Sequence, residues 1–166
     1  MRIAVVSDTH QYEPSPWLQA VYERHLAGAD ALLHCGDMTG PSLWSWFMQH
    51  PNFHAVAGNM DDWNLASQLE RTVTVRLDGP AGPLTVGMAH GFGYHGRPLW
   101  RDVAESFGPG YDLVCFGHTH EAAHHELGST IVVNPGCLQR RSSGSLAVIE
   151  VGADNSLDVS FVHPGA

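Results

Sequence analysis

The feature of this sequence that most constrains its fold is the alternation of short apolar runs with helical patterns. Strand-like runs at residues 2–7, 30–35 and 53–57 are separated by segments with helical periodicity. A β-α-β-α-β order of this kind predicts a parallel sheet with helices packed on it. Polar residues follow each run directly, so we expect them to meet at the carboxyl edge of the sheet.

Three helices are expected from apolar residues that recur on one helical face. Residues 16–27 form the first candidate, and a third is predicted at about residues 98–107. The second candidate begins at Pro41, a residue suited to a first helical turn. Its shared apolar face comprises Leu43, Trp44, Phe47 and Met48.

The second half of the chain has a pattern typical of strands. Val73, Val75 and Leu77 alternate with polar residues, and residues 84–88 and 113–116 are further apolar runs. Additional strands are expected at about 122–127, 130–133, 145–151 and 157–162. Two sheets packed face to face with helices outside would bury all these apolar faces. The sequence contains no internal repeat and no linker, so one α/β domain over residues 1–166 is predicted.

Charge and composition exclude some functions. The net charge is −9 and only 8 residues are Lys or Arg, with Arg140 and Arg141 the one adjacent pair, so bulk nucleic-acid binding is not expected. No apolar run is long enough to cross a bilayer, and no export signal is evident, so we expect a cytoplasmic protein. The three cysteines show no zinc-type spacing and are expected to be buried, reduced thiols.

Five short motifs, each directly after an apolar run, contain residues that bind metals. Together they offer two aspartates, one asparagine and four histidines, which suit Mn, Fe, Ni and Zn. Any one motif is common by chance, but five in order predict a pair of ions about 3.5–4 Å apart. The motifs are Asp8-Thr9-His10, Gly36-Asp37, Gly58-Asn59, Ala89-His90-Gly91 and Gly117-His118-Thr119-His120.

This ordered set resembles the calcineurin-like metallophosphoesterases. Within that superfamily the chain is similar to the short bacterial and archaeal phosphodiesterases related to the retromer scaffold subunit. The resemblance runs from Met1 to about Val151 and includes the turn at residues 134–137 followed by Arg140-Arg141. It implies a four-layer αββα sandwich of two packed mixed β-sheets flanked by helices, with no cap domain.

The resemblance also implies roles for individual residues. Two divalent ions are expected, with Mn favoured and Fe, Ni or Zn as alternatives, and a hydroxide that bridges them would attack phosphorus. Asp37, Asn59 and His90 are the implied catalytic residues. The implied metal ligands are Asp8, His10 and His120 at the first ion, Asp37 between the ions, and Asn59, His90 and His118 at the second.

Residues near the motifs refine this expectation. Many superfamily members have a histidine after the Asn59 position that is thought to protonate the leaving group, whereas this chain has Met60. Asp61 is either a residue that orients a ligand or an ordinary turn residue. The glycine-rich loop after His90 offers four candidate substrate-binding residues: Phe92, Tyr94, His95 and Arg97.

The function that these features favour is a metal-dependent phosphodiesterase acting on small phosphodiesters. A phosphomonoesterase of the same fold is an alternative, which Met60 disfavours because methionine cannot donate a proton. A non-catalytic, metal-binding scaffold for protein interaction is a second alternative. The expected partner is a small-molecule substrate, and a homo-oligomer is an open expectation because relatives are often oligomeric.

Overall fold

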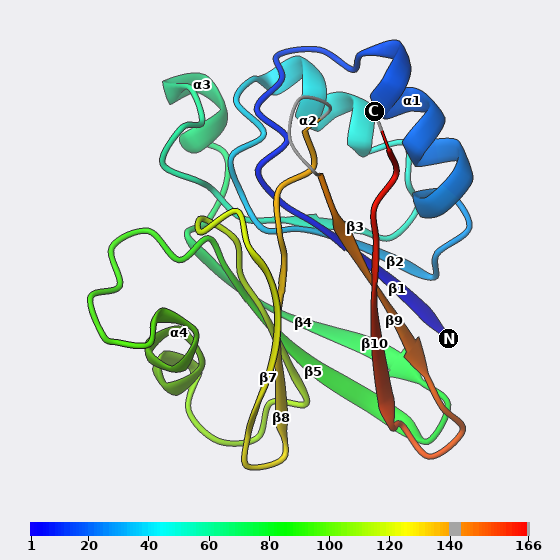
Figure 1. Cartoon of the computed structure of the whole chain (residues 1–166), viewed down its shortest axis with the longest axis vertical. Coiled ribbons are helices and arrows are strands. Elements are labelled where there is room, and N and C mark those ends of the chain that lie inside the picture. Colours follow the sequence, from blue (N-terminus) through cyan, green and yellow to red (C-terminus); the bar gives the residue numbers. More distant parts are fainter. Residues whose placement is uncertain (140–143, 166) are drawn as a thin grey trace.

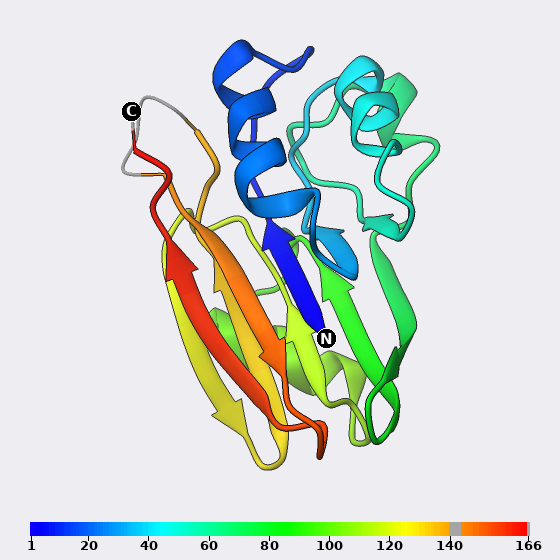
Figure 2. The ribbon, with the colours of Figure 1, turned by 90° about the vertical axis from the view of Figure 1, so that its right-hand side faces the viewer.

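The computed structural model describes residues 1–139 and 144–165, which form two five-stranded sheets. The first sheet has the order β10 (Leu157–Val162), β9 (Leu146–Val151), β1 (Arg2–Val6), β2 (Ala31–His34) and β3 (Phe53–Ala55). The second has the order β4 (Thr72–Gly79), β5 (Gly82–Ala89), β6 (Leu113–Cys115), β8 (Thr130–Pro135) and β7 (Ala122–Leu127). Figure 2 shows β10, β9 and β1 side by side in red, orange and blue.

Both sheets are mixed. In the first, β1, β2 and β3 run parallel, as the β-α-β-α-β order predicts, while β9 pairs antiparallel with β1 and β10 pairs antiparallel with β9. In the second, β5, β6 and β8 run parallel, and β4 and β7 pair antiparallel at the two edges. The parallel strands matter for function because their carboxyl ends carry the polar motifs.

Three apolar layers hold the two sheets and their helices together. Strand β1 shows the principle, because its residues alternate between faces. Ile3 and Val5 belong to the layer between the sheets, whereas Ala4 and Val6 contact helices on the outer face. A third layer joins the outer face of the second sheet to α4 (Leu99–Phe107). Figure 1 shows α4 on the opposite side of the sheets from α1 and α2. The predicted four-layer αββα sandwich is therefore confirmed.

The helices differ from the sequence prediction in detail. The helix expected over 16–27 divides into α1 (Pro16–Val21) and a π-helical segment, η1 (Tyr22–Leu26). Helix α2 (Pro41–Phe47) ends one residue before Met48. Met48 is 56% exposed, so its predicted place on the apolar face is wrong. The short helix α3 (Trp63–Ala66), capped by the side chain of Asp62, was not expected.

The structure also bears on the predictions about the cysteines and about membrane-spanning segments. Cys35, Cys115 and Cys137 are all buried, as expected. Within the described residues, every helix is too short or too polar to cross a membrane. Arg140 and Arg141 lie outside the described residues.

His34, at the end of β2, is fully buried and provides a test of the fold. Its Nε2 lies 3.1 Å from Thr9 Oγ1, and its ring packs edge-on against Phe47. Burial, reinforced by the nearby His90, lowers the pKa of His34 to about 3. Between that value and the ordinary pKa near 6.5 only the unfolded chain takes up this proton, so stability falls as pH falls.

We predict that His34→Gln removes about 2 kcal/mol of the stability difference between pH 7 and pH 5, since a tenfold difference in proton affinity is worth about 1.4 kcal/mol. Urea denaturation of chelator-treated protein at both pH values would measure it. His124→Gln is the control, because this exposed ring is hydrated in both states. An unchanged pH dependence in His34→Gln would contradict this account.

Candidate metal centre

The five motifs meet where the carboxyl ends of the two sheets come together. Asp8 and His10 follow β1, Asp37 follows β2, and Asn59 follows β3. The second sheet contributes three histidines: His90 after β5, and His118 and His120 after β6. Backbone hydrogen bonds join neighbouring loops, with Asp8 N donating to Gly36 O and Gly117 N donating to His90 O, each at 3.0 Å. The first sheet thus brings all the oxygen ligands and one imidazole, and the second sheet brings the other three imidazoles.

Most of these residues have an unusual backbone conformation. Five of the seven predicted ligands have positive φ, in the left-handed region that non-glycine residues rarely adopt: Asp8 (54°), His10 (46°), Asp37 (57°), His118 (70°) and His120 (60°). Such residues persist only where the surrounding structure holds them, and they concentrate at functional sites. The strain is independent evidence that this edge is a site.

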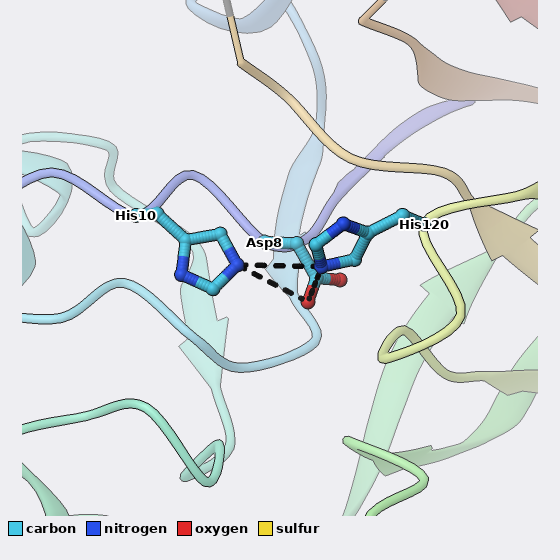
Figure 3. A group of neighbouring side chains, drawn as sticks. All are labelled: Asp8, His10 and His120. Carbon is cyan, nitrogen blue, oxygen red and sulfur yellow. Dashed lines mark hydrogen bonds and ion pairs between the residues drawn. The ribbon is translucent and has the colours of Figure 1, made fainter. Parts of the chain in front are cut away.

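The first group of candidate ligands comprises Asp8, His10 and His120, whose side chains point toward one another (Figure 3). Asp8 is buried, and its Oδ2 accepts hydrogen bonds from Ser7 Oγ and from the His118 backbone N–H. Its Oδ1 accepts none, although the Nε2 atoms of His120 and His10 lie 3.1 and 3.7 Å away. A buried carboxylate oxygen beside two imidazole nitrogens is an arrangement that a cation would satisfy.

The second group lies around His90. Its Nδ1 donates to the Cys35 carbonyl at 2.8 Å, which fixes the ring and leaves Nε2 facing two oxygens. These are Asn59 Oδ1 at 3.0 Å and Asp37 Oδ2 at 3.3 Å. Three electron-rich atoms converge here, so the site favours a positive charge, either a proton on His90 or a metal ion.

The pKa values of this pair follow from the same contacts. Burial alone would lower the pKa of His90, but the hydrogen bond and charge of Asp37 outweigh it and raise that pKa. Burial alone would raise the pKa of Asp37, but His90 and the Met60 backbone N–H together lower it. Each group thus stabilises the charged form of the other, as expected where a cation belongs.

Asp37 lies between the two groups. Its Oδ2 is 3.3 Å from His90 Nε2 and 3.8 Å from His10 Nε2, while Oδ1 accepts a hydrogen bond from Met60 N at 2.7 Å. A carboxylate in this position can contact cations on both sides. Asp8 also lies near the group around His90, because Asp8, Asp37 and His90 are close enough together to hold one metal ion.

His118 and Asp61 support the site from its margins. The His118 ring centroid lies 5.1 Å from that of His90, and His118 belongs to neither close group. Its ligand role stays a prediction. The Asp61 carboxylate accepts hydrogen bonds from Gly58 N at 2.7 Å and Thr39 N at 2.8 Å. Asp61 therefore fastens the loops that carry Asn59 and Asp37, which favours the orienting role over that of an ordinary turn residue.

A hollow of about 610 Å³ opens beside Asn59 and His90. Of the four predicted substrate-binding residues, Phe92 and Tyr94 line it, whereas His95 and Arg97 are exposed and do not. Sequence reasoning missed Arg71, which also lines the hollow. The sequence signal for Arg71 is indirect. Arg71 lies just before the alternating run at 73–77, and His90 lies just after the run at 84–88. If these two runs pair as a hairpin, Arg71 and His90 come together.

The residues present fit a pair of divalent cations. The donors are carboxylate, amide and imidazole groups without a thiolate, a set that suits Mn, Fe, Ni or Zn. The orphaned Asp8 Oδ1 and the converging atoms around His90 Nε2 define two positions where positive charge is favoured. The fit between these residues and a pair of cations rests on the side-chain contacts alone.

Comparison with known proteins gives the class. The domain model of the calcineurin-like phosphoesterase superfamily matches residues 1–154, and the chain belongs to this family. It is 26% identical to a probable metallophosphoesterase of Bacillus subtilis over 93% of this chain and 86% of that protein. It is 27% identical to a phosphodiesterase of Methanocaldococcus jannaschii over 82% of this chain and 83% of that one.

Among solved structures, the fold is similar to that of Vps29 from Entamoeba histolytica in complex with zinc. The TM-score is 0.71 at 20% identity, covering 99% of this chain and all of that one. At this identity the likeness concerns the fold. It agrees with the fold that the resemblance implies.

Gly58 offers a test of the metal centre. A Cβ at this position would collide with the Asp37 carboxylate and backbone nitrogen, so Gly58→Ala must displace both the carboxylate and the backbone of Asp37. We predict roughly 100-fold weaker Mn²⁺ binding in a folded protein, since displaced outer contacts alone weaken metal sites 10–100-fold. Isothermal titration calorimetry with Mn²⁺, alongside circular dichroism, would measure both.

Gly28→Ala is the matched control, because a Cβ there meets no atom within 4 Å. It should bind Mn²⁺ as the wild type does. Equal affinity for Gly58→Ala and the wild type would show that Asp37 is not a ligand.

Proposed function

We propose that this protein is a phosphodiesterase that hydrolyses small phosphodiesters with two divalent ions, preferably Mn²⁺. The observation that carries the proposal is the orphaned buried oxygen of Asp8 together with the oxygen atoms that converge on His90 Nε2. Membership of the phosphoesterase family supports hydrolysis, and the relative in Methanocaldococcus jannaschii supports a diester substrate.

Each residue of the site has a defined task in this proposal. Asp8, His10 and His120 would hold one ion, Asn59, His90 and His118 the other, and Asp37 would contact both. When bound, two such ions activate water as a nucleophile and neutralise charge on phosphoryl oxygens. The Cys35 carbonyl holds the His90 ring in place, and Asp61 holds the loop that carries Asn59. Asp37, Asn59 and His90 are the proposed catalytic residues.

The surroundings favour a diester over a monoester. Met60 offers no proton for a poor leaving group, and its side chain is 57% exposed beside Asn59. Three other large apolar residues are exposed close in sequence to ligand positions: Tyr12, Trp63 and Phe92. Of these, Phe92 lies next to the charged centre, with its ring 5.7 Å from that of His118, and an apolar side chain there suits a phosphate with an organic substituent on each side.

The site is proposed to be open, without a cap domain. The residues between Asn59 and His90 form only α3, β4 and β5. An open site would accept small diesters of varied shape. The scaffold alternative draws on the likeness to Vps29, but every proposed ligand position here has a side chain able to bind metal, which favours catalysis.

The proposal predicts Mn²⁺-dependent hydrolysis of bis(p-nitrophenyl) phosphate by chelator-treated protein. Asp37→Ala should reduce turnover at least about 1,000-fold because it removes the carboxylate between the ions. Asp78→Ala, which removes an exposed carboxylate on β4, should leave turnover unchanged. Absence of turnover from folded protein that has bound Mn²⁺ would reject the enzyme and favour the scaffold.

A second prediction concerns Met60. Met60→His should supply a general acid and raise kcat for diesters with alkyl leaving groups by about 10–100-fold, within the usual range for such groups. Turnover of p-nitrophenyl esters should change little, because p-nitrophenolate leaves without a proton. Met48→His is the control, since Met48 is equally exposed but lies at the end of α2. Equal rates for both variants on alkyl esters would refute the role of position 60.

A further inference from the structure

We propose that the hollow beside Asn59 and His90 contains a subsite for a second anionic group, bound by Arg71. The preferred substrates would then be nucleotide-like phosphodiesters that carry an additional phosphate. This inference rests on the proposed function and adds a substrate class to it.

The position of Arg71 is set by the pairing of β4 with β5. The antiparallel register places Thr72 opposite Ala89, so the preceding Arg71 lies across from His90 at the end of the hairpin. A hydrogen bond of 2.8 Å from Ala57 N to Glu70 O ties the same segment to the chain that leads to Asn59. Arg71 thus lines the hollow from a backbone segment that is held by the β4–β5 pairing on one side and by the hydrogen bond to Ala57 on the other.

Arg71 is an exposed cation beside the hollow of an acidic protein. The protein has a net charge of −9 and only 8 Lys or Arg residues. Arg71 is the one permanently charged cation among the described residues that line the hollow. Its guanidinium has no hydrogen bond or ion pair with any other described residue, whereas Arg101 is paired with Glu105.

An unpaired guanidinium in this position suits a phosphate that the metal ions do not bind. The metal centre would compensate the phosphoryl group under attack, which leaves Arg71 available for another. A guanidinium presents several donors in a planar fork that matches the oxygens of a phosphate. Asp61, the carboxylate of the hollow, does not compete strongly, because both its oxygens accept backbone hydrogen bonds.

Aromatic residues beside the metal centre indicate the rest of the substrate. Phe92 is 55% exposed, and its ring lies 5.7 Å from that of His118. Glycines with positive φ, Gly91 and Gly93, flank it and set the course of the loop. Tyr94 also lines the hollow, and its hydroxyl is held by Ser106 at 3.2 Å. Exposed rings of this kind stack on nucleobases without sequence preference.

The test compares two chromogenic esters that differ in one anionic group. They are thymidine 5′-(p-nitrophenyl phosphate) with and without a phosphate at the 3′ position. The wild type should hydrolyse the 3′-phosphorylated ester with about tenfold higher kcat/KM, a ratio typical of one charge-assisted contact. Arg71→Met should abolish this preference, and Arg71→Lys should retain part of it.

Arg76→Met is the matched control, because Arg76 is exposed on β4, the strand that directly follows Arg71, and lines a different hollow near Met1. It should keep the wild-type preference. A wild type that treats both esters alike, or an Arg71→Met variant that keeps the preference, would overturn the proposal.

A binding measurement separates this proposal from the proposed function. Calorimetric titration of Mn²⁺-loaded protein with thymidine 3′,5′-bisphosphate needs no turnover. About tenfold weaker binding by Arg71→Met than by Arg76→Met would support the subsite even if neither ester were hydrolysed. Equal affinity of the two variants would reject the subsite whatever the enzyme hydrolyses.

Discussion

The structure depends on two aspartates that are buried side by side where the two sheets meet. Asp8 is fully buried and Asp37 is 2% exposed. Removing an ionised carboxylate from water is costly unless hydrogen bonds and opposite charge compensate it. Backbone N–H groups and a serine hydroxyl satisfy one oxygen of each, and imidazoles face the other. A divalent ion on each side of Asp37 would complete the compensation.

The same arrangement explains why the site requires the whole sandwich. The first sheet supplies both aspartates, and the second supplies His90, His118 and His120. The apolar layer between the sheets brings the two sets together. That packing also holds five ligand positions at positive φ, a conformation that the local sequence would not maintain by itself. Metal binding and sheet packing should therefore stabilise each other.

Much of this could be predicted from the sequence because the motifs directly follow apolar strands. Strand ends in parallel sheets converge, so Asp8, Asp37 and Asn59 could be placed together without knowing the register. The four-layer architecture followed from the resemblance and from the number of apolar faces to be buried.

Other features could not be predicted, because they depend on contacts between distant residues. Arg71 reaches the hollow only through the register of β4 with β5. The role of Asp61 depends on its carboxylate, which joins two loops by accepting backbone hydrogen bonds from both. Met48 fits the helical period, but α2 ends before it, and periodicity does not mark where a helix ends. The π-helical turn after α1 likewise leaves the apolar pattern unchanged.

The most direct test of the central claim is anomalous diffraction from crystals of the protein grown with Mn²⁺. Two peaks about 3.5–4 Å apart are expected, with Asp37 between them, as in two-metal hydrolases. One ion should lie against Asp8, His10 and His120, and the other against Asn59 and His90. A single peak, or peaks remote from Asp37, would contradict the two-ion centre on which the proposed function is built.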